Sequence, residues 1–194
     1  MAQGIILAGG YSSRVKRNKM LLLYNELPII CNVIEAMMDY CTKIVVVTGH
    51  YHDEIFDVVN SYKNVIVKRN VNYNLGMFSS VITGVKEIND DFFLTPGDYP
   101  LIQNKTYEKL LNAKGTIRVP VFNNRKGHPI FIQKKLIEPL LNEPIDSNLK
   151  IFRDKHQVSY INTTDDGILI DVDTMDDYLK IKEIKKGKIN NGDS

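Results

Sequence analysis

The chain has 194 residues, 43% of them hydrophobic and 25% charged, and its formal net charge is +2. These values are typical of a single globular domain with a substantial core, and they argue against a dedicated nucleic-acid binder, which carries a strong basic excess. The two cysteines, Cys31 and Cys41, are too few for a disulfide framework and lack metal-ligand spacing. Since the sequence contains no secretory signal and no long apolar span, we expect a cytoplasmic protein with no nucleic-acid and no membrane partner.

The first predicted element is a buried strand over Ile5–Ala8 that leads into a glycine-rich, cationic loop. The run is continuously apolar and too short for a helix, as in a strand covered on both faces. Gly9 and Gly10 follow at once, and then a group of cations: Arg14, Lys16, Arg17 and Lys19. Exposed amides beside positive charge at a strand end favour phosphate binding, although a mobile basic loop is an equally open interpretation. The loop matches neither the P-loop pattern nor G-x-G-x-x-G, which excludes these two common nucleotide sites.

Helical patterns and short apolar runs alternate from Pro28 to residue 111. The predicted helices are 28–37, 51–59, 76–85 and 104–111, the last with Asn104 as its N-cap. The predicted strands are 44–47, 65–67 and 92–94. This alternation indicates a parallel sheet with helices on both faces. Right-handed crossovers then place the ends of the first and fourth strands at one edge, where ligands of open α/β sheets bind, so we expect the Gly9–Lys19 loop and Asp98 in one crevice.

The pattern changes after Ala113. Two strand-like runs, 117–122 and 129–132, flank a turn-rich segment and indicate a β-excursion added to the α/β core. Helices are predicted over 134–141 and 147–155, and strands over 158–161 and 168–172. The last helix is predicted to start at Thr174, with Asp177 completing a capping box, and to end at Ile184. We expect one domain over residues 1–185 and a flexible basic tail over 186–194.

Three aspartates are candidate metal ligands. Asp98 lies among turn formers at a strand end, so a satisfied turn carboxylate is the plain interpretation. Opposite a basic phosphate loop, however, a carboxylate is what Mg²⁺ requires together with substrate phosphates. Asp171 and Asp173 are two apart at the end of a predicted strand, and both are therefore expected on one side of it. One of the two would be the second ligand, although Asp173 is also suited to cap the last helix.

Small residues at the start of the predicted 76–85 helix indicate a second ligand contact. Gly76, Ser79 and Ser80 would let a ligand approach backbone amides, whereas for Met77-Phe78 a place in the core is an open alternative. His128, between Gly127 and Pro129, is equally suited to a structural turn and to a site. The other histidines are expected on the surface.

Five segments occur in order along the chain: LAGGYSSR followed by Lys19, LGMFSSVITGV at 75–85, PGDYPLI at 96–102, RKGHPIFI at 125–132 and DVDTMDDY at 171–178. Together they resemble the MobA-like nucleotidyltransferases, and within them the molybdenum cofactor cytidylyltransferase branch. They are similar to the opening signature of that family, its GM-x-S-S segment, its G-D-x-P metal motif, its G-H-P strand and its terminal D-x-D-T-P-E-D. The resemblance covers nearly the whole chain. It implies a single-domain, Rossmann-like (GT-A-like) α/β fold with a mostly parallel sheet.

Four positions depart from the family pattern. Lys16 stands where the loop usually has glycine, and the extra charge would strengthen phosphate binding or alter the loop. Val71 replaces a proline that often follows Asn70, and Met175 replaces the proline of the last motif, a change we expect to be harmless. Lys150 stands where relatives often have arginine, and the replacement loses bidentate geometry if the residue touches the substrate.

The resemblance implies attack by a phosphate monoester on the α-phosphorus of a nucleoside triphosphate, with release of pyrophosphate. Such transfer needs mainly positioning and charge neutralisation. It assigns catalytic roles to Arg14, Lys19 and Asp98, and Mg²⁺ binding to Asp98 and Asp173 with Asp171 in reserve. The residues that it implies in nucleotide or substrate binding are Leu7, Ala8, Gly9, Gly10, Ser12, Ser13, Asn70, Gly76, Ser79, Ser80 and His128.

The resemblance also implies the substrates. The branch uses CTP and molybdopterin, and a molybdenum hydroxylase apoenzyme is the protein partner that this chemistry suggests. GTP stays open as the nucleotide because LAGG also occurs in guanylyltransferase relatives. A sugar phosphate or another small phosphate monoester stays open as the acceptor. A non-catalytic protein that binds nucleotide or pterin is the alternative of a different class, which the retained Arg14, Lys19, Asp98 and Asp173 argue against.

Overall fold

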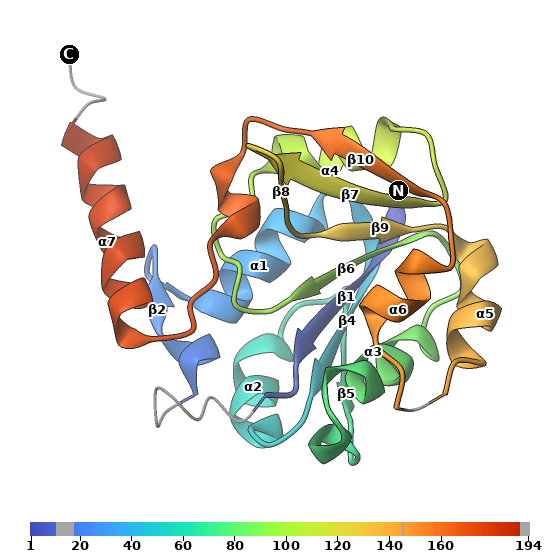
Figure 1. Cartoon of the computed structure of the whole chain (residues 1–194). Coiled ribbons are helices and arrows are strands. Elements are labelled where there is room, and N and C mark those ends of the chain that lie inside the picture. The colour runs from blue at the N-terminus through green and yellow to red at the C-terminus, as the bar shows by residue number, and fades with distance from the viewer. Residues whose placement is uncertain (11–17, 145, 191–194) are drawn as a thin grey trace.

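A computed structural model describes residues 1–10, 18–144 and 146–190 of the protein. Within these residues the chain forms an eight-stranded sheet with helices around it, and a short hairpin of β2 (Leu23–Tyr24) and β3 (Leu27–Pro28) lies beside the sheet (Figure 1). The strands of the sheet are β1 (Ala2–Ala8), β4 (Cys41–Thr48), β5 (Val65–Arg69), β6 (Phe92–Pro96), β7 (Ile117–Phe122), β8 (Arg125–Lys126), β9 (Ile130–Ile132) and β10 (Val158–Asn162). The α-helices are α1 (Ile29–Met38), α2 (His52–Val59), α3 (Met77–Val85), α4 (Asn104–Asn112), α5 (Ile137–Leu141), α6 (Leu149–Asp154) and α7 (Met175–Asn190). Short 3-10 helices are η1 (Lys19–Leu21), η2 (Tyr73–Leu75), η3 (Lys134–Leu136) and η4 (Asp166–Leu169).

The sheet is mostly parallel, which confirms the predicted fold class. Its order is β10-β7-β9-β6-β1-β4-β5, with β8 paired to β7. β1 runs parallel to both of its neighbours, β4 and β6, whereas β9 is antiparallel to β6 and β7 and forms the predicted excursion. Leu7 lies opposite Pro96 in the register of β1 and β6. The segments that follow these two strands therefore leave the sheet at the same edge.

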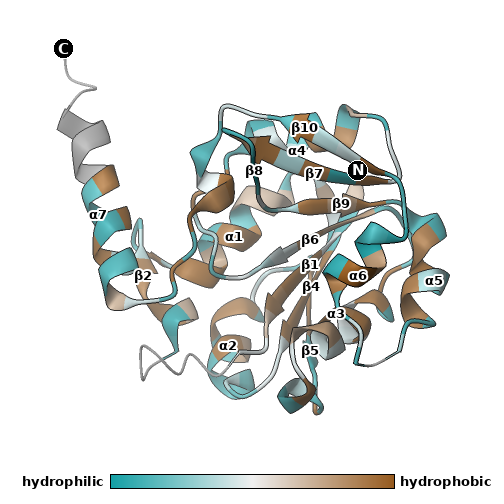
Figure 2. Cartoon of the chain, in the orientation of Figure 1, coloured by the Kyte–Doolittle hydropathy of each residue, from teal (hydrophilic) through white to brown (hydrophobic). Residues whose placement is uncertain are grey.

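Side chains of the central strands alternate between two cores, one on each face of the sheet. Ile6, Val46 and Phe93 are buried in a cluster with α1, α2 and α4. Their neighbours in sequence, such as Ile5 and Val45, are buried in a second cluster with α3, α5 and α6. In Figure 2 the central strands β1 and β4 are accordingly brown, and the helices carry both brown and teal residues. Helices on both faces were predicted, and this prediction is confirmed.

Two local predictions are wrong. Residues 168–172 form the end of η4 and an irregular stretch instead of a strand. The stretch is apolar because Ile168 and Val172 are fully buried, Val172 in a small third cluster that includes Ile29 of α1 and Ile181 of α7. Asn104 is also not the N-cap of α4, because Gln103 occupies that position and forms no side-chain cap.

The last helix begins as predicted and ends later. Thr174 Oγ1 accepts a hydrogen bond from the Asp177 amide at 3.2 Å, and Asp177 Oδ2 accepts one from the Thr174 amide at 2.9 Å, which confirms the capping box. The helix continues past Ile184 to Asn190, into the segment 186–194 whose flexibility stays a prediction. It lies beside β2 and projects away from the sheet (Figure 1). None of the described helices is long and apolar enough to cross a membrane.

Candidate active site

A pocket with a volume of about 390 Å³ opens at the edge where β1 and β6 end. Many of the residues that line it were predicted as site residues from the sequence: Leu7, Gly9, Gly10, Lys19, Gly76, Ser80, Asp98 and Asp173. Met20, Tyr73, Asn74, Met77 and Pro96 complete the lining. The pocket thus joins the end of the first strand to carboxylates from two distant parts of the chain, as the topology argument predicts.

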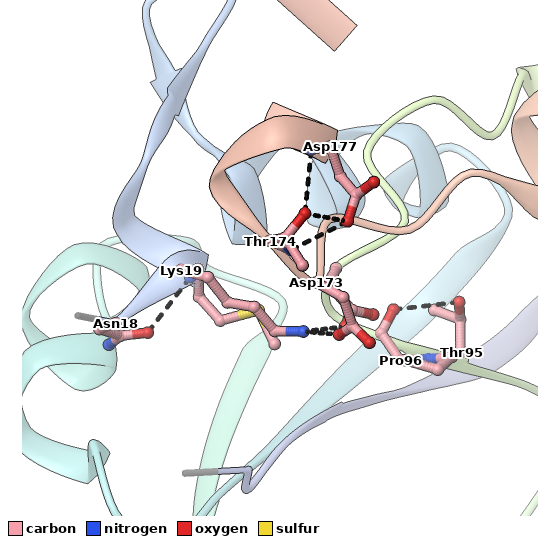
Figure 3. A network of polar contacts seen from close by, with 9 residues as sticks. Asn18, Lys19, Thr95, Pro96, Asp173, Thr174 and Asp177 are labelled. Atoms are coloured by element: carbon pink, nitrogen blue, oxygen red, sulfur yellow. Dashed lines mark hydrogen bonds and ion pairs between the residues drawn. The ribbon is translucent and has the colours of Figure 1, made fainter. Parts of the chain in front are cut away.

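The Lys19 side chain extends toward the carboxylate of Asp173 (Figure 3) and also contacts that of Asp98. Its Nζ is 2.5 Å from Asp98 Oδ2 and 2.6 Å from Asp173 Oδ1. Carboxylate oxygens of Asp98, Asp171 and Asp173 all lie within 4.8 Å of one another. The three candidate ligands are therefore close together, although the strand that was expected to align Asp171 with Asp173 does not form.

The electrostatics of this cluster favour an additional cation. Burial raises the pKa of the Asp98 carboxyl, Lys19 opposes this shift, and Asp171 adds to it. Burial lowers the pKa of the Lys19 ammonium, but Asp98 and Asp173 together outweigh burial and leave that pKa raised. Asp98 Oδ1 is buried and has no hydrogen-bond partner among the described residues. Three clustered carboxylates, two of them paired with one ammonium, and one buried unpartnered oxygen fit a hard divalent cation such as Mg²⁺.

Asp98 is positioned by the end of β6. The Gly97 amide donates to Leu7 O at 2.9 Å, which keeps this turn in register with β1. A side chain at Gly97 would meet Ile30 Cδ1 at 2.8 Å, so glycine lets the turn pack on the core. Asp173 is positioned by its two neighbours. The Val172 amide donates to Asp98 O at 3.0 Å, and Thr174 takes the capping position that was considered for Asp173.

Asn70 supports the wall of the pocket that Gly76 and Ser80 form, although it does not line the pocket itself. Its Nδ2 donates to Ser79 Oγ at 2.8 Å and to Ser80 Oγ at 2.9 Å, and its Oδ1 accepts from the Asn72 amide at 3.0 Å. Ser79 Oγ in turn contacts the Gly76 carbonyl at 2.7 Å. Gly76 has a φ of 98°, a backbone conformation that favours glycine. Asn70 and Ser79 therefore stabilise this wall through hydrogen bonds, whereas Gly76 and Ser80 line the pocket.

The structure places some predicted residues elsewhere. His128 does not line the pocket: its ring packs edge-on against Tyr99 with 4.9 Å between centroids, and burial lowers its pKa to about 4. Ala8 is a buried strand residue. Ser12, Ser13, Arg14 and Lys16 lie outside the described residues.

Sequence reasoning missed part of the lining. Core was the open alternative for Met77 and Phe78: Phe78 is buried, whereas Met77 is 66% exposed and lines the pocket. Tyr73 and Asn74 were not singled out as site residues. Their position just before Gly76, a glycine that precedes a helix, is the signal that could have identified them.

Comparisons with known proteins agree with this geometry. The family model described as the MobA-like NTP transferase domain matches residues 4–159. The chain is 30% identical to the molybdenum cofactor cytidylyltransferase of Escherichia coli (strain K12), over 92% of this chain and 94% of that protein. It is 25% identical to a probable molybdenum cofactor guanylyltransferase of Clostridium perfringens, over 92% of this chain and 96% of that protein. A solved nucleotidyl transferase from Methanothermobacter thermautotroptrophicus superposes with a TM-score of 0.80 at 21% identity, over 93% of this chain and 95% of that one, and shares the fold.

Proposed function

The chain belongs to the MobA-like NTP transferase family, and we propose that it transfers CMP from CTP to the phosphate of molybdopterin, with release of pyrophosphate. The observation that carries the proposal is the pocket in which Lys19, Asp98 and Asp173 meet the Gly9-Gly10 backbone. The choice of CTP and molybdopterin rests on the similarity to the cytidylyltransferase over nearly the whole length of both chains. A molybdenum hydroxylase apoenzyme is the protein partner that we propose for the product.

In this proposal the triphosphate lies over the strand end. Gly10 lines the pocket, and a side chain there would meet no atom of the described residues within 4 Å. Gly9 lies closer to the opposite wall, where a side chain would meet Ser80 Oγ at 2.8 Å. Two adjacent glycines thus let phosphates approach the backbone amides without a side chain between them. Arg14, which lies outside the described residues, is proposed to neutralise the departing pyrophosphate.

Lys19 changes partner in the proposed reaction. Its ammonium is held by Asp98 and Asp173, and a triphosphate in the pocket offers it an anionic alternative. Asp98 and Asp173, with Asp171 beside them, would hold Mg²⁺, which supplies charge neutralisation and polarises a phosphoryl oxygen when it is bound. Released from the carboxylates, Lys19 would stabilise the charge that develops around the α-phosphorus.

The acceptor needs little help from the protein. A phosphate monoester has a second pKa of about 6, so most of it is already a dianion at neutral pH. No general base is then required, which agrees with the absence of histidine among the described residues that line the pocket. The chemistry depends on positioning and on neutralising charge.

A second candidate uses GTP in place of CTP. It is favoured by the guanylyltransferase relatives, of which the Clostridium perfringens protein matches over nearly its full length. Tyr73 and Asn74 line the pocket close to Gly76 and are available to a base. An amide side chain both donates and accepts hydrogen bonds, so Asn74 is compatible with either base.

The test is pyrophosphate release by the purified protein with Mg²⁺ and each of the four nucleoside triphosphates, with and without molybdopterin. We expect release that requires both CTP and molybdopterin, and a cytidylylated pterin as product. Release with GTP alone among the nucleotides would replace CTP. Release with sugar phosphates in place of molybdopterin would replace the acceptor, and nucleotide binding without any release would contradict the enzymatic proposal.

A further inference from the structure

Two segments bring carboxylates into the pocket, and they are held in different ways. Asp98 directly follows β6, a buried strand of the sheet. Asp171 and Asp173 lie on the 165–173 segment, which includes η4 and is otherwise irregular. This segment is not paired with any strand. Other contacts must therefore fix the position of its two carboxylates relative to Asp98.

Several of these contacts come from Asp165, which is fully buried and does not line the pocket. Its Oδ2 accepts hydrogen bonds from the Gln103 amide at 2.8 Å and from Thr106 Oγ1 at 2.7 Å. Its Oδ1 accepts one from the Gly167 amide at 3.0 Å. A buried carboxylate is costly unless it is hydrogen-bonded in this way. Asp165 thereby acts as the side-chain cap that α4 lacks in its own sequence.

These bonds join the two carboxylate-bearing segments. Residues 98–103 run from Asp98 to the start of α4, so Asp165 holds the far end of the loop that begins with Asp98. The backbones approach closely in between, since a side chain at Gly167 would overlap the Leu101 carbonyl. At the pocket end, the Val172 amide donates to Asp98 O. The two segments are thus fastened along their length, with Asp165 as the side chain that carries most of the bonds.

We propose that Asp165 is a positioning residue that sets the affinity of the pocket for a divalent cation by keeping Asp171 and Asp173 in register with Asp98. The inference rests on the proposed function only in that a cation binds there. Groups that orient metal ligands from outside the coordination sphere affect metal affinity by about 10–100-fold when they are replaced. Asp165 acts through the backbone of the 165–173 segment, so we expect an effect at the lower end of that range.

The test is Mn²⁺ binding to the purified full chain, measured from the electron paramagnetic resonance signal of free Mn²⁺. The wild type and Asp98→Asn are compared first, and we expect that Asp98→Asn removes the site. Asp165→Asn and Thr106→Val should then weaken Mn²⁺ binding about tenfold. Thr106→Ser keeps the hydroxyl that bonds Asp165 while losing a buried methyl group, and should bind Mn²⁺ like the wild type.

A matched control separates positioning from general loss of stability. Leu140→Ala removes a fully buried side chain from the core on the α5 side of the sheet, and it should lower the melting temperature without weakening Mn²⁺ binding. All measurements are made where circular dichroism shows a folded variant. Unchanged Mn²⁺ affinity in Asp165→Asn and Thr106→Val, or equal weakening in Leu140→Ala or Thr106→Ser, would overturn the role of Asp165. If Asp165→Asn does not fold, the two Thr106 variants decide. Absence of Asp98-dependent binding in the wild type would instead overturn the metal site of the proposed function, and this inference with it.

Discussion

The two sides of the carboxylate cluster are built on different principles. Asp98 has a side chain that is 13% exposed and lies just beyond a buried strand whose register with β1 fixes it. Asp173 has a side chain that is 41% exposed and belongs to a segment fastened by loop contacts. A strand end is held by many backbone hydrogen bonds at once, whereas the 165–173 segment depends on a few bonds and close approaches. The first side is therefore expected to provide the chemistry with a rigid reference point, and the second to be sensitive to single changes and to conditions.

The largest expected effect, on turnover, comes from replacing Asp98, the carboxylate at the end of β6. Asp98→Asn keeps the size of the side chain and removes the charge that faces Lys19 at 2.5 Å. Loss of a preorganised electrostatic contact reduces turnover by about 10²–10³-fold in comparable sites. We expect that loss in Mg²⁺-dependent pyrophosphate release, with far-UV circular dichroism unchanged.

The exposed Asp176 provides the matched control, because Asp176→Asn removes the same charge from the first turn of α7 outside the pocket. It should retain the turnover of the wild type. Near-normal turnover in Asp98→Asn would contradict the assigned role.

The second prediction concerns the stability of the protein at acid pH and the 165–173 segment, which carries Asp171 and Asp173. The His128 amide donates to Ile168 O at 3.1 Å, which fastens the 165–173 segment from the β9 side, and burial lowers the pKa of the ring to about 4. In the unfolded chain His128 titrates near 6.5. Between these two values the unfolded state binds the proton and the native state does not, so the contribution of His128 to stability is constant above about pH 6.5 and falls as the pH drops toward 4. The loss attributable to His128 amounts to at most about 3 kcal/mol.

His128→Phe keeps the ring that packs against Tyr99 and removes the titration. Free energies of unfolding in urea at pH 4.5 and 7.5 should therefore differ less for His128→Phe than for the wild type. His50→Asn, at an exposed histidine, serves as the control and should behave like the wild type. An identical pH dependence in wild type and His128→Phe would show that this ring is not responsible.

The third prediction compares Gly167, in the 165–173 segment, with Gly10, which follows β1. Gly167→Ala would place a methyl group against the Leu101 backbone, whereas Gly10→Ala points into open space. Overpacking against a backbone that cannot move costs about 1–3 kcal/mol. Urea unfolding should detect this loss in Gly167→Ala and little change in Gly10→Ala. Equal stability of the two variants would mean that the 165–173 segment can shift to make room.

The same contrast explains what the sequence could predict. Asp98 was identified because its signals are local: a buried strand, then Pro96-Gly97, then a carboxylate. The capping box of Thr174 and Asp177 is local as well, and it is confirmed. The parallel sheet followed from the alternation of elements and predicted Gly9 and Asp98 at one edge, and both residues line the pocket.

The contacts that sequence reasoning missed are long-range. Asp165 bonds to Gln103 and Thr106 across about sixty positions of sequence, and nothing near α4 indicates that its cap comes from elsewhere. The apolar run 168–172 was interpreted as a strand because Ile168 and Val172 are as buried as strand residues. Their burial comes from loops and from α7, however. The local sequence pattern therefore predicts that these two residues are buried, but not which elements they pack against.

The smallest expected effect concerns Lys19, which touches both sides of the cluster. The Lys19 ammonium neutralises Asp98 and Asp173 while no other cation is bound. A divalent cation that binds on its own must displace this ammonium, which is largely buried and is then left without an anionic partner. CTP supplies that anion, and Mg²⁺ and CTP should therefore bind cooperatively, with a coupling of at least about 1 kcal/mol, or fivefold in affinity. Melting temperatures measured with Mg²⁺, with CTP and with both give the coupling through their mass-action shifts. Lys19→Met should reduce the coupling while allowing Mg²⁺ alone to stabilise the protein more than it does the wild type, and Lys180→Met, at an exposed lysine of α7, should change neither. Strictly additive shifts in the wild type would contradict an exchange of partners by Lys19.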